Sequence, residues 1–259
     1  MFPFTGTSQV RGRPGREHPA TTLGGDERRG DDERASIATS CPGPPVSTEA
    51  PGRDGAAYAD RFAAETPALL SARARAAGLV GAPAVTPAVG ATLAVLAAGA
   101  AARTVVSIGS GGGVAGLWLL EGMRPDGVLT VLDSDAEALR ATRRAFAEAG
   151  HPPGRTRMIF GTTGEVLPRL SPGAYDMVVC AGAPTQYAAH LGALVELVRV
   201  GGTVVCHGLL DGDRIADPRA RDDQTAAWRE VARAVREHEH LTSAVLPIGA
   251  GLLVATRRR

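Results

Sequence analysis

The sequence predicts an α/β protein with a seven-stranded, mostly parallel sheet, helices on both faces and a C-terminal antiparallel strand pair. Short runs rich in Val, Ile and Leu alternate with helical patterns along most of the chain, which is typical of strand–helix–strand units. Several of these runs are continuously apolar, as expected for strands buried on both faces. Only the short turn at 247–251 separates the last two runs, so they must pair antiparallel.

The elements follow one another in a regular order. Tyr58, Phe62, Leu69 and Leu70 suit one face of a first helix that should end near Gly78. The later predicted helices are residues 91–101, 114–123, the stretch between 134 and 150, and residues 163–170, 188–198 and 224–237. The predicted strands are residues 104–108, 128–132, 157–160, 175–180, 203–206, 243–246 and 252–256.

Two of the helices carry more specific signals. Ser134 and Glu137 have the spacing of a capping box at the start of their helix. In the helix over 224–237, Trp228, Val231 and Val235 share one face and should be buried together.

The first 56 residues differ in composition from the rest. They are rich in Gly, Pro, Ser, Thr, Arg and Asp and contain few large apolar residues, so burial offers little to offset the entropy of ordering them. We therefore expect residues 1–56 to be a disordered N-terminal tail and residues 57–259 to be the folded domain. A misassigned translation start is an alternative explanation of the first segment.

Composition excludes several classes of function. The formal net charge of +1 argues against a dedicated nucleic-acid binder. All 28 basic residues are arginines, which excludes a P-loop lysine, a Schiff base and a lysine general base. Three cysteines are too few for a disulfide framework, and we see neither a signal peptide nor a membrane span. We expect a cytoplasmic protein with no nucleic-acid or membrane partner.

A glycine-rich loop follows the first predicted strand, with Gly109, Gly111 and Gly113 in it, and Asp133 ends the next strand. Such a loop lets the backbone approach a ligand, and the carboxylate can accept hydrogen bonds from ribose hydroxyls. A tight turn without a ligand is the alternative. A dinucleotide pattern that ends at Gly116 overlaps the loop, but the glycine spacing and the closing antiparallel pair favour S-adenosylmethionine over NAD.

The motifs resemble those of class I S-adenosylmethionine-dependent O-methyltransferases, in the actinobacterial branch of the catechol and caffeoyl-CoA group. The stretches that carry the resemblance are residues 84–90, 105–113, 116–120, 127–133, 165–170 and 175–179. The resemblance implies a Rossmann-like fold and methylation of a hydroxyl on a small-molecule acceptor. It also implies a homodimer.

The resemblance assigns ten positions to the cofactor. They are Val85, Ser107, Gly109, Ser110, Gly111, Gly113, Ala115, Asp133, Ser134 and Thr163. Val85 would contact the methionine end through its backbone, Asp133 would hold the ribose, and Thr163 would lie near the adenine. Helix capping is the alternative for both Ser134 and Thr163.

Other positions depart from the family pattern. Relatives usually carry Glu where this chain has Ser107, and Ser where it has Ala115. Metal-dependent relatives carry Asp-x-Asp where this chain reads Ala181-Gly-Ala183 and Asp-Asn where it reads His207-Gly208, and the lysine base of the catechol enzymes aligns with Pro184. Because a divalent ion needs hard oxygen ligands, we expect no divalent metal at the usual site.

His207 is the candidate general base, because neutral imidazole can accept a proton near pH 7. A polar strand end without a chemical role is the alternative. Asp211 and Asp213 in the following loop are candidates for substrate binding. A soft-metal site made of Cys180, Cys206 and His207 is conceivable, but such cysteines are more often small core residues.

Two further hypotheses compete with an active methyltransferase. A catalytically degenerate S-adenosylmethionine-binding protein of the same fold would explain why several family positions depart together. An NAD-dependent oxidoreductase would rest only on the overlapping glycine pattern.

Overall fold

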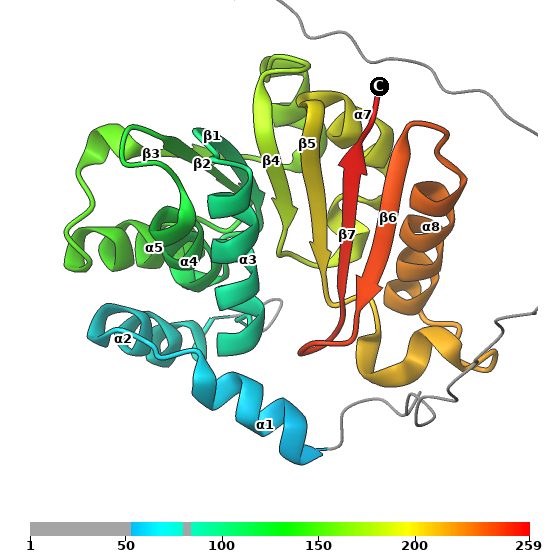
Figure 1. The fold of residues 1–259 in the computed structure, drawn as a ribbon, viewed down its shortest axis with the longest axis horizontal. Helices are drawn as coiled ribbons and strands as arrows, with labels where there is room; N and C mark the ends of the chain where they lie inside the picture. Colours follow the sequence, from blue (N-terminus) through cyan, green and yellow to red (C-terminus); the bar gives the residue numbers. More distant parts are fainter. Residues whose placement is uncertain (1–52, 80–83) are drawn as a thin grey trace, which may run out of the picture. The chain divides into compact units, whose positions relative to one another are not determined.

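The computed structural model describes residues 53–79 and 84–259, which build a seven-stranded sheet in the order β3-β2-β1-β4-β5-β7-β6 (Figure 1). The strands are β1 (Thr104–Ile108), β2 (Val128–Asp133), β3 (Thr156–Phe160), β4 (Tyr175–Cys180), β5 (Val198–His207), β6 (Leu241–Leu246) and β7 (Leu252–Arg257). Strands β1 to β5 are parallel, and β7 runs antiparallel to both β5 and β6. The predicted fold class is confirmed.

Eight α-helices accompany the sheet in the described ranges. They are α1 (Arg53–Phe62), α2 (Pro67–Ala76), α3 (Pro87–Gly99), α4 (Val114–Gly122), α5 (Ala136–Glu148), α6 (Thr163–Val166), α7 (Leu191–Leu197) and α8 (Asp223–Glu237). Residues 1–52 of the predicted tail lie outside the described residues, and α1 begins four residues before the predicted start of the domain. None of these helices is long and apolar enough to cross a membrane.

The single helix predicted between residues 57 and 78 is wrong, because the chain forms two helices there. The Thr66 hydroxyl accepts a hydrogen bond from the Leu69 N–H at 3.3 Å and caps α2. Pro67, the first residue of α2, disfavours helical backbone at the residue before it. Of the four apolar residues predicted on one face, Leu69 is buried. The other three are exposed: Tyr58, Phe62 and Leu70.

The predicted caps also shift by one residue in α5 and α6. Asp135, not Ser134, caps α5, and its carboxylate accepts the N–H groups of Glu137 and Ala138. In α6 the cap is Thr162, which forms a capping box with Glu165. Ser134 and Thr163 therefore do not cap these helices, and the capping alternatives for both residues are wrong.

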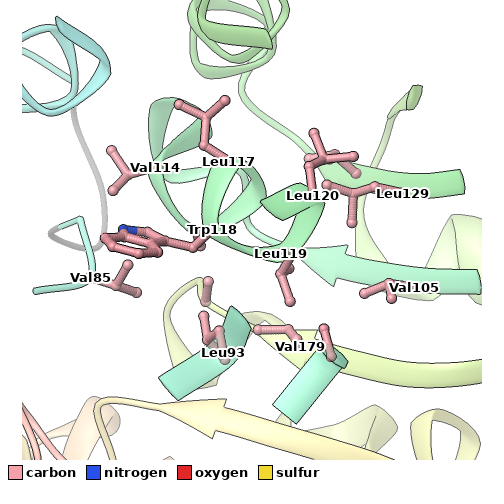
Figure 2. Close-up of a cluster of buried hydrophobic side chains, with 14 of the residues drawn as sticks. Val85, Leu93, Val105, Val114, Leu117, Trp118, Leu119, Leu120, Leu129 and Val179 are labelled. Carbon is pink, nitrogen blue, oxygen red and sulfur yellow. The ribbon is translucent and has the colours of Figure 1, made fainter. Parts of the chain in front are cut away.

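Successive residues of the central strands point to opposite faces, and each face has its own apolar core. In β1, Val105 belongs to the core under α2, α3, α4 and α5, whereas Val106 belongs to the core under α6, α7 and α8. Figure 2 shows part of the first core, where Leu120 of α4 lies beside Leu129 of β2. In the second core, Trp228, Val231 and Val235 are buried as predicted.

Helices α3 and α4 pack closely, and two glycines make this contact. A Cβ on Gly90 would lie 2.2 Å from the Trp118 indole. A Cβ on Gly122 would lie 2.0 Å from the Ala94 carbonyl oxygen. The second neighbour is backbone and cannot turn away as a side chain can, so any residue larger than glycine at 122 would separate the helices.

The order of the strands reverses between β1 and β4. The chain proceeds from β1 to β2 and β3 on one side, then continues with β4 and β5 on the other. In open parallel sheets, ligands bind at the carboxyl ends of the strands beside such a reversal. The glycine loop after β1 lies there.

Substitution of Gly122 should separate α3 from α4. We expect Gly122→Ala to lower the free energy of unfolding by about 3 kcal/mol, because the added methyl meets fixed backbone. Gly99, also the last residue of its helix, has nothing within 4 Å of an added Cβ. Gly99→Ala should therefore raise the stability by about 0.5 kcal/mol. Urea unfolding measures both values, and equal losses would contradict this account of the packing.

Candidate functional site

The glycine loop is fixed against the segment that follows β4. The Ile108 carbonyl accepts hydrogen bonds from the N–H groups of Ala181 (2.8 Å) and Gly182 (3.0 Å). Gly109 has a φ of +83°, and a Cβ there would lie 2.4 Å from the Gly182 nitrogen. Both the backbone conformation and the close approach require glycine.

The loop is also tied to the end of β2. Oδ2 of Asp133 accepts hydrogen bonds from the Ser110 N–H at 2.7 Å and the Ser110 hydroxyl at 2.6 Å. Oδ1 of Asp133 accepts the Asp135 N–H at 2.9 Å. One carboxylate thus joins the glycine loop to the start of α5. A carboxylate has about four lone-pair sites, so Oδ1 keeps capacity for one further donor.

A main cavity of about 500 Å³ opens along the carboxyl ends of the strands, a volume typical of small-molecule sites. A side cavity of about 250 Å³ adjoins it. The residues that line both cavities are Gly109, Asp133, Ser134 and Gln186. Asp133 therefore stands where the two cavities meet.

The predicted cofactor residues divide into two groups. Those that line the main or side cavity are Gly109, Gly111, Asp133, Ser134 and Thr163. Those that line neither cavity are Val85, Ser107, Ser110, Gly113 and Ala115. The residues of the first group line two adjoining cavities. The residues of the second group could affect a bound molecule only through other residues that do line a cavity.

Most of the second group have other contacts. The Val85 carbonyl accepts a hydrogen bond from Arg73 at 2.8 Å, and Arg73 also pairs with Glu65 at 2.6 Å. The Ser107 hydroxyl bonds the Gly109 carbonyl at 3.3 Å. A Cβ on Gly113 would press on α5, at 3.0 Å from the Ala145 methyl. Ser107 and Gly113 therefore contribute to the conformation of the glycine loop and to its packing against α5.

The far end of the main cavity lies beyond β4 and β5, where His207, Asp211, Gln224 and Trp228 line it. Asp213, the other predicted substrate residue, does not line the cavity. The Trp228 indole packs edge-on against the Tyr187 ring, with the ring centroids 6.3 Å apart. Trp228 thus belongs to the apolar core and also lines the main cavity.

His207 ends β5 and is 6% exposed. Its imidazole forms no hydrogen bond within the described ranges, and burial lowers the pKa of His207 below its usual value of 6.5. The side chain is therefore neutral at pH 7, with a nitrogen able to accept a proton. His207 lines the far end of the main cavity.

The ends of β4 and β5 do not offer the oxygen ligands that Mg²⁺ or Ca²⁺ requires. Where the resemblance implies Asp-x-Asp and Asp-Asn, the cavity lining has Ala181-Gly-Ala183 and His207-Gly208, with no side-chain oxygen. In residues 53–79 and 84–259, no three His, Cys, Asp or Glu side chains gather in a way that could hold a metal ion. A hydrogen bond with Cys206 and complete burial raise the pKa of the Cys180 thiol well above its usual value, which disfavours a thiolate ligand.

Sequence reasoning missed two prominent residues of the site. Gln186 borders both cavities from the loop after β4, and Trp228 was predicted only as a core residue. The position of Gln186 after a parallel strand was the available signal, because loops at these strand ends carry ligand contacts. Nothing in its own helix distinguishes Trp228 from a purely structural residue.

The chain is similar in sequence and fold to known proteins. A family model described as O-methyltransferase matches residues 65–258. A protein from Mycobacterium bovis that is named as an O-methyltransferase is 46% identical over 216 residues, which cover 83% of this chain and 95% of the relative.

Solved structures agree with the sequence comparison. A structure from Corynebacterium glutamicum is 32% identical to this chain, with a TM-score of 0.71. The match covers 78% of this chain and 94% of the other. The O-methyltransferase TomG from Streptomyces achromogenes, solved in complex with S-adenosylmethionine, has 24% identity and a TM-score of 0.70, covering 78% and 95%. At 24% identity, the likeness to TomG supports the fold alone.

Burial of neutral His207 predicts a titration below the usual range. Because the unfolded chain binds this proton more readily, its contribution to stability is present above pH 6.5 and declines as the pH falls through 6.5. Burial also lowers the pKa of His151, so NMR of the imidazole C–H signals should show midpoints below 6.5 for both histidines, and only that of His207 should be missing from the His207→Gln variant. A His207 midpoint at or above 6.5 would contradict the burial argument.

Proposed function

The chain belongs to the O-methyltransferase family, and on that premise we propose that it transfers the methyl group of S-adenosylmethionine to a hydroxyl of a small molecule. One observation carries the proposal: two adjoining cavities share Asp133 at the carboxyl end of the sheet. One cavity suits the adenosine part of the cofactor, and the far end of the other leaves room for an acceptor.

The residues present fit this cofactor. A Cβ on Gly111 would have nothing within 4 Å, so the loop offers bare backbone and open space to a ligand. The remaining lone pair of Asp133 can accept a ribose hydroxyl, and rotation of the Ser110 hydroxyl would release a second. Ser134 and Thr163, neither of which caps a helix, line the cavity on the adenine side.

Bound S-adenosylmethionine would supply a methyl group on a sulfonium, which the acceptor oxygen would take up in line as the carbon–sulfur bond breaks and S-adenosylhomocysteine leaves. The protein's part is to hold the acceptor hydroxyl against that carbon, since positioning alone can contribute several kcal/mol. We propose that His207 takes the hydroxyl proton. Its neutral imidazole lines the far end of the main cavity, and no other imidazole within the described ranges does so.

The reaction we propose needs no divalent metal. Where the resemblance implies Asp-x-Asp and Asp-Asn, the chain has alanine, glycine and histidine, and these side chains cannot provide the oxygen shell of a hard cation. The base must then act without a metal to lower the acceptor's pKa. Acceptors with moderately acidic hydroxyls, such as phenols, suit a histidine base best.

We also propose a cytoplasmic location without a nucleic-acid or membrane partner. The near-neutral net charge and the sparse cysteines support this. The homodimer stays a prediction that rests on the family resemblance.

Cofactor binding is the first test. We expect S-adenosylhomocysteine to bind in calorimetry, and Asp133→Asn to weaken binding at least about tenfold, because an amide replaces the charged acceptor. Asp126→Asn, on an exposed turn remote from both cavities, should bind as the unmodified protein does. No binding at millimolar ligand would overturn the proposed function, whereas unchanged affinity in Asp133→Asn would remove Asp133 from the cofactor site.

Activity without metal is the second test. We expect transfer of labelled methyl from S-adenosylmethionine to members of a phenol panel, with rates in excess EDTA within about twofold of those without it. His207→Gln should lower kcat about 100-fold and leave S-adenosylhomocysteine affinity unchanged. Activity that EDTA abolishes and Mg²⁺ restores would contradict the metal-free reaction. Cofactor binding without transfer to any acceptor would favour the catalytically degenerate protein.

A further inference from the structure

The charges that line the main cavity are all negative in the part of the chain that the structure describes. Three carboxylates line it, those of Asp133, Asp135 and Asp211. No arginine does so within residues 53–79 and 84–259, although the chain contains 28 basic residues. Asp133 and Asp135 belong to the cofactor end, so Asp211 is the charge that an acceptor would meet.

Asp211 is held in a fixed position. Its Oδ1 accepts a hydrogen bond from Gln224 Nε2 at 2.8 Å. Its Oδ2 lies 3.0 Å from the Thr225 hydroxyl, whose single proton it shares with Asp222 Oδ2 at 2.9 Å. Its side chain is only 11% exposed. Arg214 approaches Oδ2 to 3.5 Å, but the same guanidinium forms a closer ion pair with Asp222. The negative charge of Asp211 is therefore oriented and only partly offset.

The other titratable group at this end is His207, which is more than nine-tenths buried, has no hydrogen-bond partner within the described ranges, and lines the same cavity. Because its imidazole is neutral at pH 7, it does not compensate Asp211. Trp228 also lines this end with the small part of it that is exposed, and an indole attracts cations. A carboxylate, an indole and an unprotonated base thus share one end of the cavity.

We propose that the acceptor is a hydroxylated molecule that carries a cationic nitrogen, with Asp211 as its counter-ion and the exposed part of Trp228 as an aromatic contact. The inference rests on the proposed function, because it concerns the acceptor end of that site. The same charges disfavour acceptors that bear a carboxylate or phosphate, thioesters of coenzyme A included. Asp211 is then a specificity-determining residue, whereas His207 serves the reacting hydroxyl.

Three phenols of similar size test the charge preference: tyramine, 4-ethylphenol and 3-(4-hydroxyphenyl)propionate. Their binding to the complex of the protein with S-adenosylhomocysteine is measured by calorimetry at pH 7. We expect tyramine to bind about tenfold more tightly than 4-ethylphenol, and the propionate to bind most weakly. A propionate affinity equal to that of tyramine would overturn the proposal.

Two matched variants assign the preference to one residue. Asp211 and Asp213 both have positive φ, at 46° and 69°, which asparagine tolerates, but only Asp211 lines the cavity. Asp211→Asn should abolish the preference for tyramine over 4-ethylphenol, and Asp213→Asn should retain it. A preference that persists in Asp211→Asn would overturn the role of Asp211.

The ligand order in the unmodified protein tests the inference even where Asp211→Asn does not fold. Failure of all three phenols to bind while S-adenosylhomocysteine binds would overturn this inference and leave the proposed function standing. Failure of S-adenosylhomocysteine itself to bind would instead overturn the proposed function.

Discussion

The hydrogen bonds between Ser110 and Asp133 are the link on which the site depends. The loop after β1 contains four glycines with positive φ: Gly109, Gly111, Gly112 and Gly113. Such a loop has much conformational freedom to lose on folding. Hydrogen bonds to a carboxylate contribute about 1.5–3 kcal/mol each, enough to hold one conformation. Because Asp133 also accepts the Asp135 N–H, the same carboxylate fixes the start of α5.

The fixed position of this loop determines which elements at the carboxyl edge of the sheet can contact a cofactor and an acceptor. Gly109 lies directly against Gly182. The segments after β1 and β4 therefore meet where the strand order reverses, and both line the main cavity. Cofactor contacts can then come from β1, β2 and the loop after β3, and acceptor contacts from β5 and α8. The family's scaffold is kept, while alanine, glycine and histidine stand where the resemblance implies metal ligands, and neutral His207 lines the same cavity as Asp211.

The sequence predicted the parts of this structure that depend on local pattern. The bounds of β1 and β4 and the glycine loop followed from apolar runs and spacing. The two helices in place of one could also have been read from Thr66 and Pro67. The cap at Asp135 could not be separated from Ser134 by pattern, because adjacent polar residues suit the same position.

Tertiary packing decided the remaining positions. Gly113 matched a cofactor motif, yet its missing side chain makes room for α5. Trp228 has the spacing of a core residue, and only the packing of α8 against the segments that follow β4 and β5 brings it to the cavity. A crystal structure with S-adenosylhomocysteine bound tests the central claim most directly. The account predicts ribose hydroxyls on Asp133, adenine beside Thr163 and sulfur facing the end of the cavity that holds His207. Ribose bound away from Asp133, or sulfur facing away from His207, would contradict it.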